Sequence, residues 1–237
     1  MKVFVIHPER LKERGEHIDR MMRRIGMDYE FVNEGSDEER IQAYTVRWMR
    51  NGRENMLERS SRMLCTMSHF MAYERIVSEG LDGALVLEDD IVLHDDFLPR
   101  FNQSVEEFRR DYADQRVLIS YEDSSLQLVP RSQRQKGRML YPGRRDRLSG
   151  AYFISAVAAR TILDLLDKEQ CDRAIDVYHN LLIQQQQVDY LWCHPALATQ
   201  GSFTGQFRSA LSKKKDRMIV LDWWFKKHYK QLLYWFR

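Results

Sequence analysis

Ala84-Leu85-Val86-Leu87-Glu88-Asp89-Asp90-Ile91-Val92-Leu93 is the stretch that decides the fold and points to the chemistry. Its first apolar run, residues 84–87, is typical of a buried strand. The next three residues, Glu88, Asp89 and Asp90, belong to a type that is almost never buried unless it is paired or holds a cation. Three adjacent acids at the end of a buried strand are explained if their oxygens are ligands of a hard divalent cation. The alternative is a solvated turn whose acids cap a neighbouring element.

The composition indicates a globular chain. Of its 237 residues 43% are hydrophobic and 30% are charged, which fits one domain or one domain with a small extension. Cys65, Cys171 and Cys193 have no zinc-like spacing, so we expect reduced, buried cysteines in a cytosolic protein. Residues 3–6 are too short an apolar run for a secretory signal, and no stretch resembles a membrane span. We expect a cytoplasmic protein, or one bound peripherally to the inner face of the cytoplasmic membrane.

The last part of the chain, residues 209–237, is a basic and aromatic tail. It carries eight Lys and Arg and two Asp, so its net charge is +6. Because the whole chain has a net charge of +2, the remaining residues have a net charge of −4. On a helix, one face would hold Phe225, Tyr229, Leu232 and Phe236, and another Lys226, Lys230 and Arg237. Such a helix suits an anionic membrane surface, and packing of its aromatics on the core is the alternative. Nucleic acid is not an expected partner, because the body is acidic and no recognition motif is present.

Hydrophobic periodicity predicts alternating strands and helices. Strands are expected at residues 3–6, 29–32, 84–87, 117–120 and 151–154, and helices at 11–25, 63–77 and 156–166, with a weaker helix near 41–49. Asp95 and Asp96 are expected to cap a helix that begins at Phe97. This order predicts an α/β domain with a mainly parallel sheet. Ligands bind such sheets beyond the carboxyl ends of the strands, where the His7-Pro8 turn and the three acids would lie.

Six motifs in order resemble glycosyltransferase family 25, which includes bacterial lipooligosaccharide galactosyltransferases and is related to procollagen galactosyltransferases. They are VFVIHPERLKER (3–14), CTMSHFMAYERIV (65–77), ALVLEDDIVL (84–93), RLSGAYFISAVAARTIL (147–163), AIDVY (174–178) and HPALATQ (194–200). The resemblance implies a GT-A-type nucleotide-sugar-binding fold for residues 1–208, followed by the tail at 209–237 as an amphipathic helix. It also implies inverting transfer from a UDP-sugar with Mn²⁺ (or Mg²⁺), with galactose as the expected sugar and a lipooligosaccharide or related glycan as the acceptor.

A departing diphosphate needs a counter-cation, and that cation needs protein carboxylates. By resemblance, Asp90 is the first expected metal ligand, and Glu88 is the second because alternate residues of an extended chain share a face. Asp89 would then face the ribose or the sugar hydroxyls. A C-terminal histidine often completes the metal site of GT-A enzymes, and His194 is the nearest candidate here.

An inverting transfer needs a general base. Asp176 matches the acidic position of the family motif, and capping of a following helix is its alternative role; Asp189 is the rival base. Ser149 and Gly150 resemble a loop that lets the backbone approach the donor sugar. The pair Ser68-His69 is expected to contact the donor.

The end of the first predicted strand is expected to bind uracil and ribose through Ile6 and His7, together with Arg14. The family usually has Asn-Leu where this chain has His7-Pro8, and proline removes a backbone donor, so the contacts there stay open. The segment 131–147 holds seven Lys and Arg. It would close over a diphosphate, bind an anionic glycolipid, or be a solvated surface.

Two other functions stay open at the level of sequence. A glycoside hydrolase would use two facing carboxylates and no metal. A catalytically silent family member would act as a binding protein through the tail at 209–237.

Overall fold

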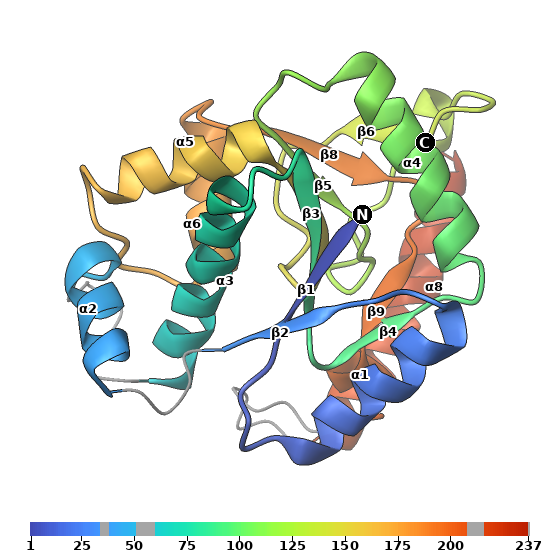
Figure 1. The fold of residues 1–237 in the computed structure, drawn as a ribbon. Helices are drawn as coiled ribbons and strands as arrows, with labels where there is room; N and C mark the ends of the chain where they lie inside the picture. Colours follow the sequence, from blue (N-terminus) through green and yellow to red (C-terminus); the bar gives the residue numbers. More distant parts are fainter. Residues whose placement is uncertain (34–37, 51–59, 208–215, 237) are drawn as a thin grey trace.

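The main sheet has seven strands, five of which run in the same direction (Figure 1). The structure is a computed structural model and describes residues 1–33, 38–50, 60–207 and 216–236. In spatial order the strands are β2 (Glu30–Val32), β1 (Lys2–Ile6), β3 (Gly83–Glu88), β7 (Ala151–Ser155), β5 (Val117–Ser120), β8 (Asp189–Cys193) and β6 (Leu140–Pro142). Strands β7 and β6 run against the others. The predicted α/β class with a mostly parallel sheet is confirmed.

Helices cover both faces of this sheet because its strands are apolar on both sides. In β1, Phe4 and Ile6 point to one core, and Val3 and Val5 point to the other, as the alternation of a strand requires. The first face is covered by α2 (Glu38–Trp48), α3 (Ser61–Ser78), α5 (Ala156–Leu166) and α6 (Ile175–Gln184), and the second by α1 (Lys12–Ile25) and α4 (Phe97–Asp111) (Figure 1).

The chain leaves the main sheet directly after the three acids. Strand β3 ends at Glu88, Asp89 and Asp90 form a turn, and the next apolar run becomes β4 (Ile91–Leu93). Strand β4 pairs antiparallel with β9 (Ala198–Gln200) in a separate ribbon, and the short helix α7 (Gly201–Thr204) follows. The Gly201 amide donates to the Asp90 carbonyl over 2.7 Å. This ribbon fixes the turn that presents the acids.

Local signals explain several helix ends. Helix α1 ends at Gly26, whose φ of 70° lies in the left-handed region that favours glycine, and α3 begins with Ser60, which accepts from the Met63 amide. Helix α4 begins at Phe97 as predicted and Asp96 occupies its N-cap position, but the Asp96 side chain makes no capping hydrogen bond. The Asp96 carboxylate accepts from Arg100 one turn later instead.

The basic segment 131–147 contains short regular elements. It contains a 3₁₀ turn, η1 (Arg131–Gln133), and the edge strand β6. Arg147 is buried, donates to the Cys193 carbonyl over 3.0 Å and lies over the Trp192 ring. A solvated role is therefore wrong for Arg147, which is a packing residue.

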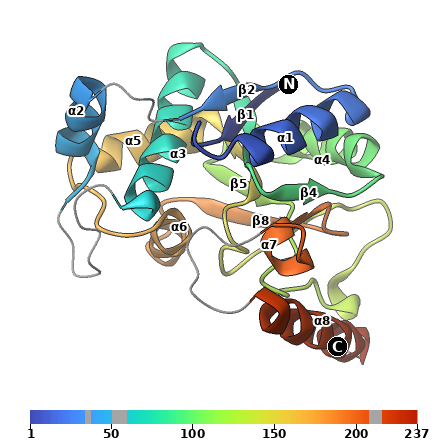
Figure 2. The ribbon, with the colours of Figure 1, turned by 90° about the horizontal axis from the view of Figure 1, so that it is seen from below.

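The tail forms helix α8 (Asp216–Phe236), which lies at the edge of the body (Figure 2). Trp223 is buried and donates its indole N–H to the Ser124 carbonyl over 2.8 Å, and Lys227 pairs with Asp123. Among the side chains of this helix that the structure describes, the exposed large apolar ones are Leu221, Trp224, Phe225, Tyr229, Leu232, Leu233 and Phe236. None of the described helices is long and apolar enough to cross a bilayer. The predicted boundary at 208/209 lies outside the described residues.

Candidate functional site

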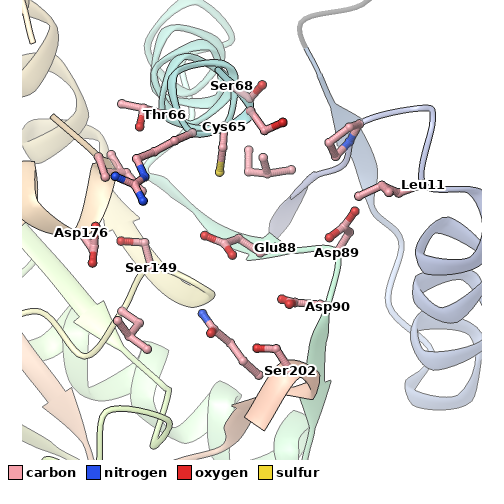
Figure 3. Close-up of a pocket in the computed structure, with 18 of the residues that line it drawn as sticks. Leu11, Cys65, Thr66, Ser68, Glu88, Asp89, Asp90, Ser149, Asp176 and Ser202 are labelled. Atoms are coloured by element: carbon pink, nitrogen blue, oxygen red, sulfur yellow. The ribbon is translucent and has the colours of Figure 1, made fainter. Parts of the chain in front are cut away.

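A cavity of about 410 Å³ lies at the carboxyl ends of β1 and β3 (Figure 3). The two strands are parallel and pair Ile6 with Glu88, so the segments that follow both strands meet at this edge. The start of α3 and the first turn of α6 form the opposite walls. The volume lies within the range of small-molecule sites, about 300 to 1,000 Å³.

Asp89 is held by side chains of the protein itself. One carboxylate oxygen accepts from the Arg14 guanidinium over 2.7 Å, and the other lies 3.0 Å from His7 Nδ1. Only 4% of Asp89 is exposed. His7 in turn packs against Gly15, where an added Cβ would come within 2.8 Å of the imidazole ring. Asp89 and His7 therefore tie β1, β3 and α1 together.

Glu88 and Asp90 are differently placed. Burial, together with the charge of the neighbouring acids, raises the pKa of both carboxyls. Asp90 is 7% exposed, its Oδ1 has no hydrogen-bond partner among the described residues, and its Oδ2 lies 3.5 Å from Arg14. Glu88 and Asp90 line the cavity, as Asp89 does (Figure 3). Glu88 and Asp90 are thus held at one wall of the cavity, and the positive charge close to them does not balance both carboxylates.

Asp176 lies on the opposite wall, in the first turn of α6. The N-cap position belongs to Ala174, so Asp176 is not the N-cap residue of α6, although backbone amides of the first turn hydrogen-bond its carboxylate. Burial, and then the charge of Asp146, raise the Asp176 pKa. Ser149 lines the cavity near Asp176 (Figure 3) and donates to the Asp146 carboxylate over 3.3 Å.

His69 lies behind the cavity wall and is fully buried, so burial excludes the donor contact expected for it. Ser68 lines the cavity and donates to the Leu64 carbonyl of its own helix. His69 belongs to a buried hydrogen-bonded chain that sequence reasoning missed, with Tyr152, Tyr73 and His179 as its further members. In the sequence, Cys65, His69 and Tyr73 follow one another at intervals of four residues. This spacing places them on one face of a helix and was the signal from which their proximity could have been predicted.

Four other predicted residues do not line the cavity, and one of them, His7, contacts Asp89 instead. Asp189 is exposed at the start of β8, at the opposite end of the sheet from the acids. His194 lies at a second cavity beside Arg134 and Arg138, where burial lowers its pKa to about 4. Gly150 is buried and donates to Glu122 over 2.9 Å. An added Cβ at Gly150 would meet Glu122 and Gln200, each at 2.8 Å, so this glycine serves packing.

Of the predicted strand-end contacts, Ile6 lines the cavity directly, together with Pro8 and Leu11. Arg14 lines it as well while it pairs with the acids. Arg10 and Arg62 add two positive side chains to the same lining. The cavity thus combines an apolar end with acids and arginines, which suits a ligand that has both a flat apolar part and a charged part.

Comparisons with known proteins identify the family. The model of glycosyltransferase family 25, described as an LPS biosynthesis protein, matches residues 1–178. No curated protein gives a significant match. A solved glycosyltransferase involved in glycosylation of the major capsid of PBCV-1 has 10% identity and a TM-score of 0.43, covering 94% of this chain and 98% of that one. The apo-form glycosyltransferase GlyE of Streptococcus pneumoniae TIGR4 has 12% identity and a TM-score of 0.42, covering 95% and 63%.

These two structural likenesses are too distant to add to the assignment, which rests on the family match. That match spans 178 of the 237 residues. The chain therefore belongs to glycosyltransferase family 25 and is a glycosyltransferase.

Proposed function

We propose that the chain transfers galactose from UDP-galactose to a lipooligosaccharide or a related glycan, with inversion at the anomeric carbon and with Mn²⁺ or Mg²⁺. The observation that carries this proposal is the pair Glu88 and Asp90, held with raised pKa values at a cavity that arginines also line. The family assignment favours transfer over the glycoside hydrolase and the silent binding protein.

The residues present fit a divalent cation. Asp90 Oδ1 is buried and has no hydrogen-bond partner among the described residues, and Glu88 reaches the same cavity. Carboxylate oxygens are the ligands that Mn²⁺ and Mg²⁺ prefer. Glu88 and Asp90 are our proposed metal ligands. Asp89 is a less suitable ligand because its carboxylate already contacts Arg14 and His7, and His194 is less suitable because it lies away from the cavity. When bound, the ion supplies positive charge against the leaving diphosphate.

The donor would lie along the cavity. The apolar end formed by Ile6, Pro8 and Leu11 suits the uridine, and Arg10 and Arg62 suit the diphosphate. The sugar would then extend toward the wall that carries Ser149 and Asp176.

Asp176 is the proposed general base. As the acceptor oxygen forms its bond to the anomeric carbon, the bond from that carbon to the diphosphate oxygen breaks, and UDP leaves with the electron pair. The acceptor hydroxyl proton passes to the Asp176 carboxylate. Its raised pKa supports this role, because a base works best with a pKa nearer the working pH.

A lipid-linked acceptor is supported by the exposed face of α8. Phe225 and Tyr229 are 64% and 63% exposed, and Lys226 and Lys230 lie on the same helix. We assign residues 1–208 to catalysis and 209–237 to an anionic membrane surface, at the inner face of the cytoplasmic membrane.

A panel of nucleotide sugars tests the donor. Thermal unfolding would be followed with UDP-galactose, UDP-glucose, UDP and GDP-mannose, each with and without Mn²⁺. Binding at about 100 times Kd stabilises the native state by about 2.7 kcal/mol. We expect the largest increase in Tm with UDP-galactose and Mn²⁺ together, and little with GDP-mannose. A flat panel would contradict the proposed donor.

A further inference from the structure

Cys65, His69 and Glu88 form a cluster of mixed donor atoms at the cavity wall. Their ligand atoms all lie within 4.8 Å of one another. Cys65 and His69 are one helical turn apart on α3, and Glu88 stands at the end of β3. Figure 3 shows the Cys65 sulfur on the α3 wall above the Glu88 carboxylate. The three residues therefore approach one point from two elements.

A buried chain of hydrogen bonds connects Asp146 to His69. The Asp146 carboxylate lies 2.7 Å from His179 Nδ1, which therefore donates, and in the neutral form of His179 the ring accepts at Nε2. Tyr73 donates to that nitrogen over 2.8 Å, and Tyr152 then donates to Tyr73 over 2.6 Å. The Tyr152 oxygen is left to accept from His69 Nδ1 over 2.7 Å. In this arrangement His69 Nε2 carries a lone pair, which is the form of the ring that can bind a metal ion.

That lone pair points at another acceptor. His69 Nε2 lies 3.6 Å from Glu88 Oε1 and has no hydrogen-bond partner among the described residues, although His69 is 0% exposed. A lone pair and a carboxylate that face each other in a buried site are unfavourable unless a proton or a metal ion lies between them, and 3.6 Å is too long for a hydrogen bond. The Cys65 sulfur adds a third donor on the cavity side.

We propose that Cys65, His69 and Glu88 bind Zn²⁺, with the fourth ligand position facing the cavity. A thiolate, an imidazole nitrogen and a carboxylate are the ligand types of zinc, whereas Mn²⁺ and Mg²⁺ prefer oxygen alone. Bonds of about 2.0 to 2.3 Å require donors about 3.4 to 3.6 Å apart, close to the present His69–Glu88 separation. Binding releases the thiol proton.

Occupancy of this site would inhibit transfer. Glu88 is also a ligand in our proposed Mn²⁺ or Mg²⁺ pair, so zinc at Cys65 and His69 withdraws Glu88 from Asp90. This inhibitory consequence rests on the proposed function, but zinc binding itself does not. Zn²⁺ is thus expected to lower Mn²⁺-dependent transfer and to act less strongly on Cys65→Ser.

Titration of the full, reduced chain with Co²⁺ alone, as a spectroscopic substitute for Zn²⁺, tests the site. We expect one Co²⁺ per chain, a thiolate-to-cobalt charge-transfer band in the near ultraviolet, and displacement of the ion by Zn²⁺. Cys65→Ser should abolish the band. Tyr152→Phe removes the acceptor of His69 Nδ1 and should weaken binding about 10- to 100-fold. Cys171→Ser, which alters a cysteine outside the cluster, should retain the band.

Asp90→Asn separates the two proposals, because it should retain the cobalt band whether or not transfer is lost. If Cys65→Ser does not fold, alkylation of Cys65 in the unaltered chain, read by mass spectrometry with and without Zn²⁺, replaces it; protection is expected. Absence of the band in the unaltered chain, a band that survives Cys65→Ser, or alkylation that Zn²⁺ does not slow would each overturn the zinc site.

Discussion

Asp89 accepts a hydrogen bond of 2.7 Å from Arg14, and this contact commits the central acid of the run to helix α1. The same Arg14 lies 3.5 Å from Asp90. Arg14 therefore serves two buried acids, Asp89 and Asp90, and the third acid, Glu88, lines the same cavity without an ion-pair contact to Arg14 within 4 Å. This division explains how three consecutive carboxylates are tolerated at the end of a buried strand.

Removal of Arg14 should destabilise the fold. Arg14→Met leaves the buried Asp89 without its guanidinium partner, which costs about 3 to 5 kcal/mol when a buried ion pair is broken. Denaturant unfolding measures the change. Arg20→Met is the matched control, because Arg20 is exposed and its pair with Glu16 spans 3.7 Å, for which we expect less than about 0.5 kcal/mol. Equal losses would refute the role given to Arg14.

The stability of the metal-free protein should fall as pH rises. Burial, followed by the charge of Glu88, raises the Asp90 pKa to about 7, so the folded state holds a proton that the unfolded state releases near pH 4. Between these values the folded state binds more protons, and stability declines with pH. Asp90→Asn should therefore be more stable than the unaltered chain by about 2 kcal/mol at pH 8, and by little at pH 4. Asp95→Asn, at an exposed acid, should show no such difference.

Asp176 and Asp189 can be told apart by activity. Asp176→Asn should lower kcat by about 10² to 10⁴-fold with little change in the KM for the donor, because it removes only proton transfer. Asp189→Asn changes an exposed residue at the far end of β8 and should retain the original kcat. The reverse result would assign the base to Asp189.

Vesicle sedimentation tests the exposed face of α8. Trp224→Ser with Phe225→Ser should weaken binding to phosphatidylglycerol vesicles about tenfold or more, given about 1.5 to 3 kcal/mol for each large apolar side chain that is buried. The control is Val46→Ser, which alters an equally exposed apolar residue on α2. Binding that is unchanged in the double variant, or equally weak to phosphatidylcholine, would remove the membrane role.

The sequence predicts the strand that ends at Glu88 and the edge where the cavity lies, because both follow from a local apolar run and the α/β order. It does not predict that Asp89 pairs with Arg14, since the two residues are 75 positions apart and only the register of β1 and β3 brings them together. The hydrogen-bonded chain through Tyr73, Tyr152 and His179 is missed for the same reason. The antiparallel direction of β7 likewise depends on pairing between distant segments.

Metal dependence of transfer is the most direct test of the central claim. The rate of galactose transfer from UDP-galactose would be measured for exhaustively chelated protein, before and after addition of Mn²⁺, in the unaltered chain and in Asp90→Asn. We predict no transfer without the ion, recovery with Mn²⁺ in the unaltered chain, and a loss of about 100-fold or more in Asp90→Asn. Full transfer after chelation, or an Asp90→Asn variant as active as the unaltered chain, would contradict the assignment of Glu88 and Asp90.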